Sequence, residues 1–224
     1  MMENNTCNHL QITTYVINLP QRAERRKHIE EQFFDKPEFI VHFIQAESDV
    51  IGAVGLWKSI TKIVKHAMYN TDDDVILICE DDHVFTEIYD RDAFFHNIIQ
   101  GAKYNTHIIF GGIGGGHNII SVSNNLYWVD MAWCTQFMVI FREAFSLILE
   151  SLFSEIDVAD EFLCKILPNK LVIWPFISVQ QDFGYSDVTM LNARPGNITQ
   201  LFENMNKKFE KYNTVKNRLN NIQQ

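Results

Sequence analysis

Three consecutive carboxylates, Glu80-Asp81-Asp82, directly follow a short apolar run at residues 75–79. An uninterrupted apolar run of this length is typical of a strand buried on both faces, as in a parallel sheet between helices. Ligands of open α/β sheets bind just outside the carboxyl ends of such strands. Neighbouring acids repel one another unless they are compensated, and their oxygens suit Mg²⁺ or Mn²⁺ that arrives with a phosphate. The alternative is that Asp81 and Asp82 only open a turn, because Asp is a favoured turn residue.

Arginines follow the first predicted strand, residues 13–19, which ends at Pro20. The sequence predicts a helix over residues 21–34, and its first turns carry Arg22 and Arg25. Guanidinium groups match phosphate oxygens in a bidentate way, so these arginines could clamp a pyrophosphate. The alternative is an ordinary solvated helix face, on which arginines pair weakly with neighbouring glutamates.

A second acidic cluster lies far along the chain and contains Asp157, Asp160 and Glu161. Asp160 follows Asp157 by three residues, so both could share one face of a helix. A carboxylate from this cluster could serve as a general base. The alternative is that the acids only favour a helix N-terminus through the helix dipole.

Glycine is concentrated between the two acidic clusters, where five of the chain's ten glycines fall in residues 111–116. This backbone must turn tightly or approach another group closely. No Gly-Lys-Ser/Thr ending follows, so the segment is not a P-loop. A flexible surface loop is the alternative.

Strands and helices alternate through residue 110, which indicates a parallel sheet with right-handed crossovers. The predicted strands are residues 13–19, 39–44, 75–79, 106–110, 127–129, 137–141 and 171–174. The predicted helices are residues 21–34, 56–69, 90–100, 142–153 and 199–222. The fourth helix is expected to turn Phe145, Ile148, Leu149 and Leu152 inward. We therefore expect an α/β domain over residues 12–198, with a mostly parallel central sheet and a mixed, irregular C-terminal half. An amphipathic helix at residues 199–224 then packs on the body or on a partner.

Composition narrows the class of protein. The 224 residues are 46% hydrophobic and 12% aromatic, which is enough for a sizeable core. A net charge of −9 argues against a general affinity for nucleic acid. Four widely spaced cysteines form no metal-type pair and indicate thiols in a reducing compartment. With no run of 18 apolar residues and no signal-peptide core, we expect a soluble cytoplasmic protein.

The order of these pieces resembles glycosyltransferase family 25, which contains bacterial lipooligosaccharide galactosyltransferases and collagen galactosyltransferases. The resemblance covers residues 12–190 and has a first and a central motif. The first is Val16-Ile17-Asn18-Leu19-Pro20-Gln21-Arg22-Ala23-Glu24-Arg25-Arg26, and the central one is the apolar strand that ends in Glu80-Asp81-Asp82. Weaker matches are Ala46-Glu47-Ser48-Asp49, the helix after Gly55, the glycine-rich exit after Phe110, residues 137–149, residues 158–163 and residues 180–188.

This resemblance implies a GT-A-like fold. It also implies a metal-dependent transfer of a hexose, galactose or glucose, from a nucleotide-diphosphate sugar such as a UDP-sugar. The acceptor would be a hydroxyl of a bacterial surface glycan such as lipopolysaccharide, and the reaction would invert the anomeric centre. The implied metal is Mn²⁺ or Mg²⁺, held by Asp82 and Glu80. The implied donor-binding residues are Asn18, Arg22, Arg25, Ala46, Glu80 and Asp81. The implied general base is Asp160, with Asp157 and Glu161 as alternatives.

Other functions stay open. The family's helix after Gly55 usually carries a Cys and a Ser-His pair, whereas this chain has Leu56-Trp57-Lys58-Ser59-Ile60. Because of this departure, the protein could also be a catalytically inactive relative that binds nucleotide sugar or glycan. A phosphoryl or nucleotidyl transferase also uses strand-end carboxylates with metal, but it usually needs a Lys or a glycine-rich phosphate loop near the first strand. A modified DNA base as acceptor is disfavoured by the acidic charge balance. Membrane contact is expected to be peripheral at most, at the inner membrane, and the sequence does not predict an oligomeric state.

Overall fold

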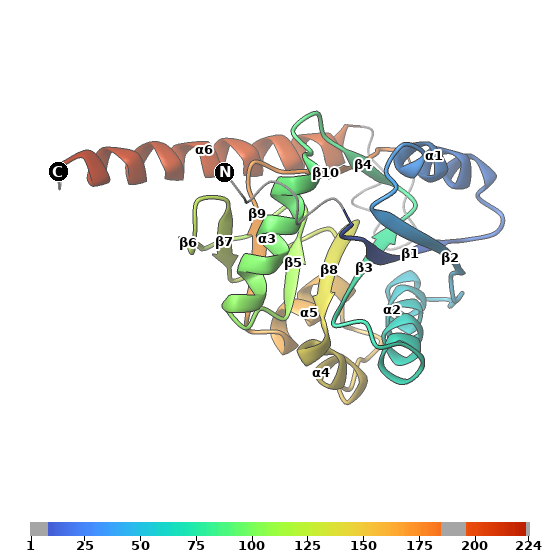
Figure 1. Cartoon of the computed structure of the whole chain (residues 1–224). Coiled ribbons are helices and arrows are strands. Elements are labelled where there is room, and N and C mark those ends of the chain that lie inside the picture. The colour runs from blue at the N-terminus through green and yellow to red at the C-terminus, as the bar shows by residue number, and fades with distance from the viewer. Residues whose placement is uncertain (1–8, 185–195, 223–224) are drawn as a thin grey trace.

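The computed structural model describes residues 9–184 and 196–222, and these residues form an α/β fold around one large mixed sheet (Figure 1). The strands are β1 (Ile12–Asn18), β2 (Phe39–Gln45), β3 (Val75–Glu80), β4 (His83–Phe85), β5 (Ile108–Phe110), β6 (Ile119–Ser121), β7 (Leu126–Val129), β8 (Phe137–Phe141), β9 (Lys170–Ile173) and β10 (Ser178–Gln180). The helices are α1 (Ala23–Phe33), α2 (Gly52–Asn70), α3 (Arg91–Lys103), the 3₁₀ turn η1 (Arg142–Ala144), α4 (Phe145–Leu149), α5 (Ala159–Ile166) and α6 (Asn197–Ile222). The predicted fold class is therefore confirmed.

The strand order across the main sheet is β2-β1-β3-β8-β5-β9-β7-β6. Strand β1 is parallel to both β2 and β3, because α1 and α2 carry the chain back between these strands. Strand β8 runs antiparallel to β3 and to β5, with Cys79 opposite Phe137. The segment that leads into β8 therefore lies at the carboxyl end of β3, beside the three acids.

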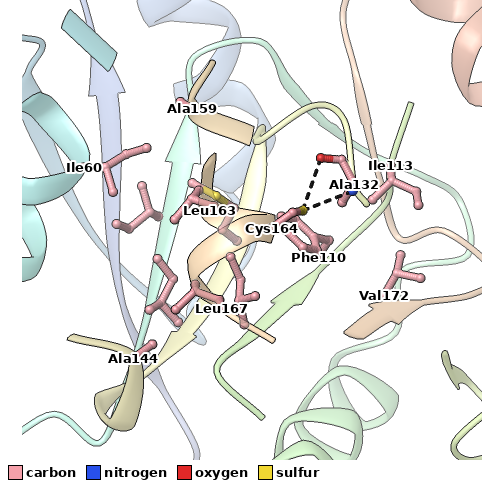
Figure 2. Packing of buried hydrophobic residues seen from close by; sticks show 14 of the residues in the cluster. Ile60, Phe110, Ile113, Ala132, Ala144, Ala159, Leu163, Cys164, Leu167 and Val172 are labelled. Carbon is pink, nitrogen blue, oxygen red and sulfur yellow. Dashed lines mark hydrogen bonds between the residues drawn. The ribbon is translucent and has the colours of Figure 1, made fainter. Parts of the chain in front are cut away.

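Two hydrophobic clusters cover the two faces of the sheet. Alternate residues of β3 divide between them, since Ile76 and Ile78 belong to one cluster and Leu77 and Cys79 to the other. The first cluster includes side chains of α2, α4, α5 and α6, and the second includes side chains of α1 and α3. Figure 2 shows part of the first cluster, where the Cys164 thiol of α5 bonds to the backbone of Ala132.

The long helix α6 packs on the body through its first turns. Ile198, Phe202, Met205 and Phe209 are buried, and the rings of Phe209 and Tyr127 meet edge to face at 5.3 Å. The far end of α6 extends beyond the sheet (Figure 1). No helix among residues 9–184 and 196–222 is both long and apolar enough to cross a membrane.

Several local predictions were wrong. The predicted helix over residues 142–153 is a 3₁₀ turn followed by α4, which ends at Leu149. Leu152 is consequently 92% exposed instead of buried, and Phe153 stacks on Trp57 at 4.9 Å in the core. The strands of the main sheet through residue 110, β1, β2, β3 and β5, do run in one direction as predicted, but β8 lies between β3 and β5 and is antiparallel to both. The short strands β4, β6 and β10 were not predicted.

Candidate functional site

A cavity of about 800 Å³ opens at the carboxyl ends of β1, β2 and β3. Its walls come from the segments after these strands, the start of α2, the segment before β8, the start of α5, the end of β10 with residues 181–183, and the first turns of α6. Most of the predicted site residues line it. These are Arg22, Arg25, Ala46, Glu80, Asp81, Asp82, Asp160 and Glu161.

Arg25 of α1 compensates the acids at the end of β3. Its Nη1 lies 3.2 Å from Asp81 Oδ1 and 3.3 Å from Asp82 Oδ2, and all three side chains are buried. Asn18, at the end of β1, donates its Nδ2 hydrogen to Asp81 Oδ2 over 2.8 Å. Arg25 and Asn18 therefore bind the carboxylates, which is a different contact from the predicted one with the donor. Asn18 does not itself line the cavity among the described residues.

Asp82 has one satisfied and one unsatisfied carboxylate oxygen. Besides the contact with Arg25, its Oδ2 accepts a hydrogen bond from Gln180 Nε2 of β10 at 2.7 Å. Its Oδ1 is buried and has no hydrogen-bond partner among the residues that the structure describes. Burial, followed by the charge of Asp81, raises the pKa of Asp82 to about 6, although Arg25 acts in the opposite direction. An orphaned buried carboxylate oxygen beside a cavity is where a cation would be expected.

Glu80 is held by the segment that leads into β8. The Thr135 hydroxyl donates to Glu80 Oε1 over 2.5 Å. Burial of the carboxyl group, followed by the charge of Asp82, raises the pKa of Glu80 to about 8, although part of the residue remains accessible to solvent. With no cation bound, Glu80 is therefore mostly protonated at neutral pH.

Asp160 faces the same cavity from the first turn of α5. Its Oδ2 accepts the backbone N–H of Cys134 at 3.1 Å, and its Oδ1 accepts that of Glu161 at 2.8 Å. Burial raises the pKa of Asp160 above its ordinary value. Cys134 has a left-handed backbone, with φ of 77°, which is uncommon for a residue other than glycine. Two consecutive residues therefore contact the two acids, since Cys134 binds Asp160 and Thr135 binds Glu80. No sequence signal pointed to Cys134 or Thr135.

The structure separates Asp157 from the other predicted acids. Helix α5 begins at Ala159, so Asp157 lies before the helix and shares no helical face with Asp160. Its Oδ2 accepts hydrogen bonds from the Ser154 backbone N–H at 2.8 Å and from the Ser154 hydroxyl. Asp157 is not among the described residues that line the cavity, and its carboxylate closes a turn with Ser154.

Two glycines allow close approaches at the cavity wall. A Cβ on Gly115 would lie 2.0 Å from Cε3 of Trp133, a residue that lines the cavity. A Cβ on Gly55 would lie 2.7 Å from the carbonyl oxygen of Glu47, in the segment after β2. The predicted close approach of the glycine-rich segment is confirmed, and Trp133 is one of its contacts.

Among residues 9–184 and 196–222, no three His, Cys, Asp or Glu side chains form a group that could hold a metal ion by themselves. Cys79, Cys134 and Cys164 are free thiols. Cys7 and residues 185–188, the end of the late motif, lie outside the described residues.

Comparisons with known proteins support the fold. No family model and no curated protein matches the sequence. The structure is similar to that of A197 from STIV, with a TM-score of 0.52 and 13% identity, covering 80% of this chain and 87% of that one. Lower similarity is found to apo-UDP-glucose pyrophosphorylase (TM-score 0.47, 8% identity, covering 88% and 82%) and to HddC from Yersinia pseudotuberculosis (TM-score 0.40, 8% identity, covering 87% and 100%). The first similarity shows a shared fold alone, and the other two are too low to carry an argument.

Proposed function

We propose that this protein is a glycosyltransferase that moves a hexose from a nucleotide-diphosphate sugar to an acceptor hydroxyl. The observation that carries the proposal is the presence of two separate acid sites in one cavity, Asp82 at the end of β3 and Asp160 at the start of α5. Transfer with inversion needs charge stabilisation at the departing diphosphate and a base that reaches the acceptor from another side. The sequence resemblance to glycosyltransferase family 25 supports the same reaction.

The donor nucleotide fits the side of the cavity formed by β1, β2 and α2. Small residues line it there, including Ala46, Gly52 and Gly55, and they leave room for a flat base. Arg22 lines the same cavity as the N-cap residue of α1, so its guanidinium is placed to bind the diphosphate. Arg25 acts on the donor site indirectly, because its guanidinium binds Asp81 and Asp82 and holds these carboxylates in place.

A divalent cation fits the acids at the end of β3. The unpartnered Oδ1 of Asp82 would supply one oxygen ligand, and Glu80 would supply a second once it loses its proton. Mg²⁺ is commonly bound by one or two carboxylates together with substrate phosphates, which agrees with the lack of a three-residue cage in the described chain. When bound, the cation would stabilise the negative charge on the diphosphate.

Asp160 is the general base in this proposal. Its raised pKa makes its carboxylate a better proton acceptor than a solvated aspartate. The backbone N–H groups of Cys134 and Glu161 fix its orientation, so the carboxylate stays directed while it takes the proton of the acceptor hydroxyl.

The proposal is tested by donor binding and hydrolysis with UDP-galactose and UDP-glucose, each measured with and without Mn²⁺. Asp82→Asn keeps the size of the side chain and removes the charge, and we expect it to abolish the Mn²⁺-dependent part of donor binding. Asp157→Asn is the matched control, because its carboxylate lies outside the cavity, and it should behave as the wild type. Equal Mn²⁺-dependent affinity in Asp82→Asn and the wild type would contradict the proposal.

A catalytically inactive binder of nucleotide sugars is the second candidate. It is favoured by the contacts of Asp82 Oδ2, which Arg25 and Gln180 compensate without a metal. Donor binding that is independent of Mn²⁺, with no hydrolysis or transfer, would support this candidate over the enzyme.

A further inference from the structure

We infer that the acceptor is an uncharged saccharide whose ring packs against the indole of Trp133. This inference rests on the proposed function and names the class of the second substrate. It starts from the side of the cavity that the donor does not use, where the segment before β8 meets α5 and α6.

Trp133 is held rigidly at this side of the cavity. Its ring rests on Gly115, where a Cβ would lie 2.0 Å from Cε3. The backbones are also tied together, because Trp133 donates its N–H to Gly115 at 3.1 Å and accepts that of Gly114 at 2.9 Å. An aromatic ring fixed in this way offers a contact surface at little cost in conformational entropy.

The residue that follows Trp133 contacts the candidate base. Trp133 precedes Cys134, whose N–H binds Asp160 Oδ2. Val158, Ile198 and Leu201 also line the cavity and provide further apolar surface. The indole Nε1 is buried and has no hydrogen-bond partner among the described residues.

This combination matches the chemistry of a sugar ring. A pyranose has an apolar face of C–H groups that can pack on an aromatic ring, and its edge carries hydroxyls that donate to carboxylates and accept from an indole N–H. Asp160 and Glu161 supply carboxylates in the same cavity. A fixed aromatic surface with a few convergent polar groups is the usual form of a specific small-molecule subsite.

The charges select an uncharged acceptor. Acidic side chains line the cavity at Asp160, Glu161 and Asp182, in addition to those at the end of β3. Of the lining arginines, Arg25 is bonded to Asp81 and Asp82, and Arg22 belongs to the donor side. A phosphodiester backbone or a sialylated glycan would therefore be repelled, which disfavours a nucleic acid acceptor.

The test is acceptor kinetics at saturating UDP-sugar and Mn²⁺. Lactose is compared with 3′-sialyllactose and with a single-stranded DNA oligomer that carries hydroxymethylated bases. We expect measurable transfer to lactose only. Trp133→Ala should raise the KM for lactose about tenfold, while the KM for the donor and the rate of donor hydrolysis stay at wild-type values. Trp133→Phe should have a KM for lactose between those of the wild type and Trp133→Ala, since phenylalanine keeps an aromatic ring and lacks the N–H.

Two further variants separate the indole from general effects on folding. Gly115→Ala leaves Trp133 in the chain but displaces its ring, so it should raise the KM for lactose as well. Trp128→Ala is the control, because its half-buried indole bonds to the Pro168 carbonyl and is not part of the cavity lining. Trp128→Ala should leave the KM for lactose unchanged.

The outcomes distinguish this inference from the proposed function. Unchanged KM for lactose in Trp133→Ala, or faster transfer to sialyllactose or DNA, would overturn the inference while donor hydrolysis still supported a glycosyltransferase. A wild type that neither binds nor hydrolyses a nucleotide sugar would refute the proposed function. In that case saturation-transfer NMR with lactose decides the inference, because binding that depends on Trp133 supports it and absence of binding overturns it.

Discussion

Replacing Arg25 by methionine should destabilise the protein strongly, and more at pH 8 than at pH 5. Arg25 Nη1 contacts Asp81 at 3.2 Å and Asp82 at 3.3 Å, and the side chains are 6% and 7% exposed. Methionine retains most of the apolar length of arginine but removes the charge. The two carboxylates would then be buried beside each other without their shared cation.

The expected loss at pH 8 is about 3–5 kcal/mol, the usual cost of removing one partner from a buried ion pair. For a chain of this size, each kcal/mol shifts the midpoint of thermal unfolding by about 2–4 °C, so the shift should be about 6–20 °C. Lys27→Met, on the same helix, is the matched control. Lys27 pairs with Glu31 at 3.9 Å, both side chains are well exposed, and the expected change is within about 0.5 kcal/mol.

The pH dependence follows from Asp82. Its pKa in the folded protein, about 6, lies above the value of an unfolded chain, so its contribution to stability is present at low pH and is lost as pH rises through 6. Arg25 favours the charged form of Asp82 and therefore limits that loss. At pH 5 Asp82 is mostly protonated and the arginine contributes less, so Arg25→Met should cost less there than at pH 8.

Urea unfolding at pH 5 and at pH 8, without divalent cations, measures the effect. An Arg25→Met variant as stable as the wild type would refute the assigned contact. An equal loss at both pH values would refute its electrostatic origin. A variant of normal stability that no longer bound UDP would instead support a direct contact of Arg25 with the diphosphate.

Three other variants or conditions test the rest of the site. Mn²⁺ should raise the unfolding temperature more at pH 8 than at pH 6, because Glu80, with a pKa of about 8, must lose its proton to bind a cation; equal shifts in a thermal-shift series would contradict this. Asp160→Asn should lower turnover about 10²–10⁴-fold while calorimetry shows nearly unchanged donor affinity, and a variant that only lost donor affinity would place the base elsewhere. Gly55→Ala should lower the free energy of unfolding by about 1–3 kcal/mol, because its Cβ would lie 2.7 Å from the Glu47 carbonyl; wild-type stability in urea would mean that the segment after β2 can move aside.

Local sequence signals predicted the parts of the fold that depend on neighbouring residues. The apolar run before Glu80 indicated β3, because a strand buried on both faces needs apolar residues at every position. The family resemblance singled out Asp160, and the structure brings it into the cavity that Asp82 lines. The amphipathic period of the last helix likewise predicted that it packs on the body. Phe202 and Phe209 do so, whereas Val215 and Leu219, farther along the same stripe, are exposed.

Pairings between distant residues could not be predicted in this way. Strand β4 has three residues and is held by β10, where Gln180 lies opposite His83. Leu152 has the right spacing for an inward helical position, but α4 ends at Leu149, and Phe153 is the residue that stacks on Trp57. The contact of Arg25 with two acids depends on how α1 crosses the end of β3, which the sequence around Arg25 does not encode.

The antiparallel insertion of β8 between β3 and β5 also governs when the site can form during synthesis. A nascent chain that has not reached Phe137 lacks the strand that joins the two halves of the sheet, so β3 and β5 each keep an open hydrogen-bonding edge. The same late segment supplies Thr135 to Glu80 and the Cys134 N–H to Asp160. Pairings between residues far apart in sequence form slowly, and here one of them joins β3 to β5 and brings Cys134 and Thr135 to the cavity. An N-terminal fragment released by a ribosome before this point would therefore be an aggregation-prone half-sheet with no site.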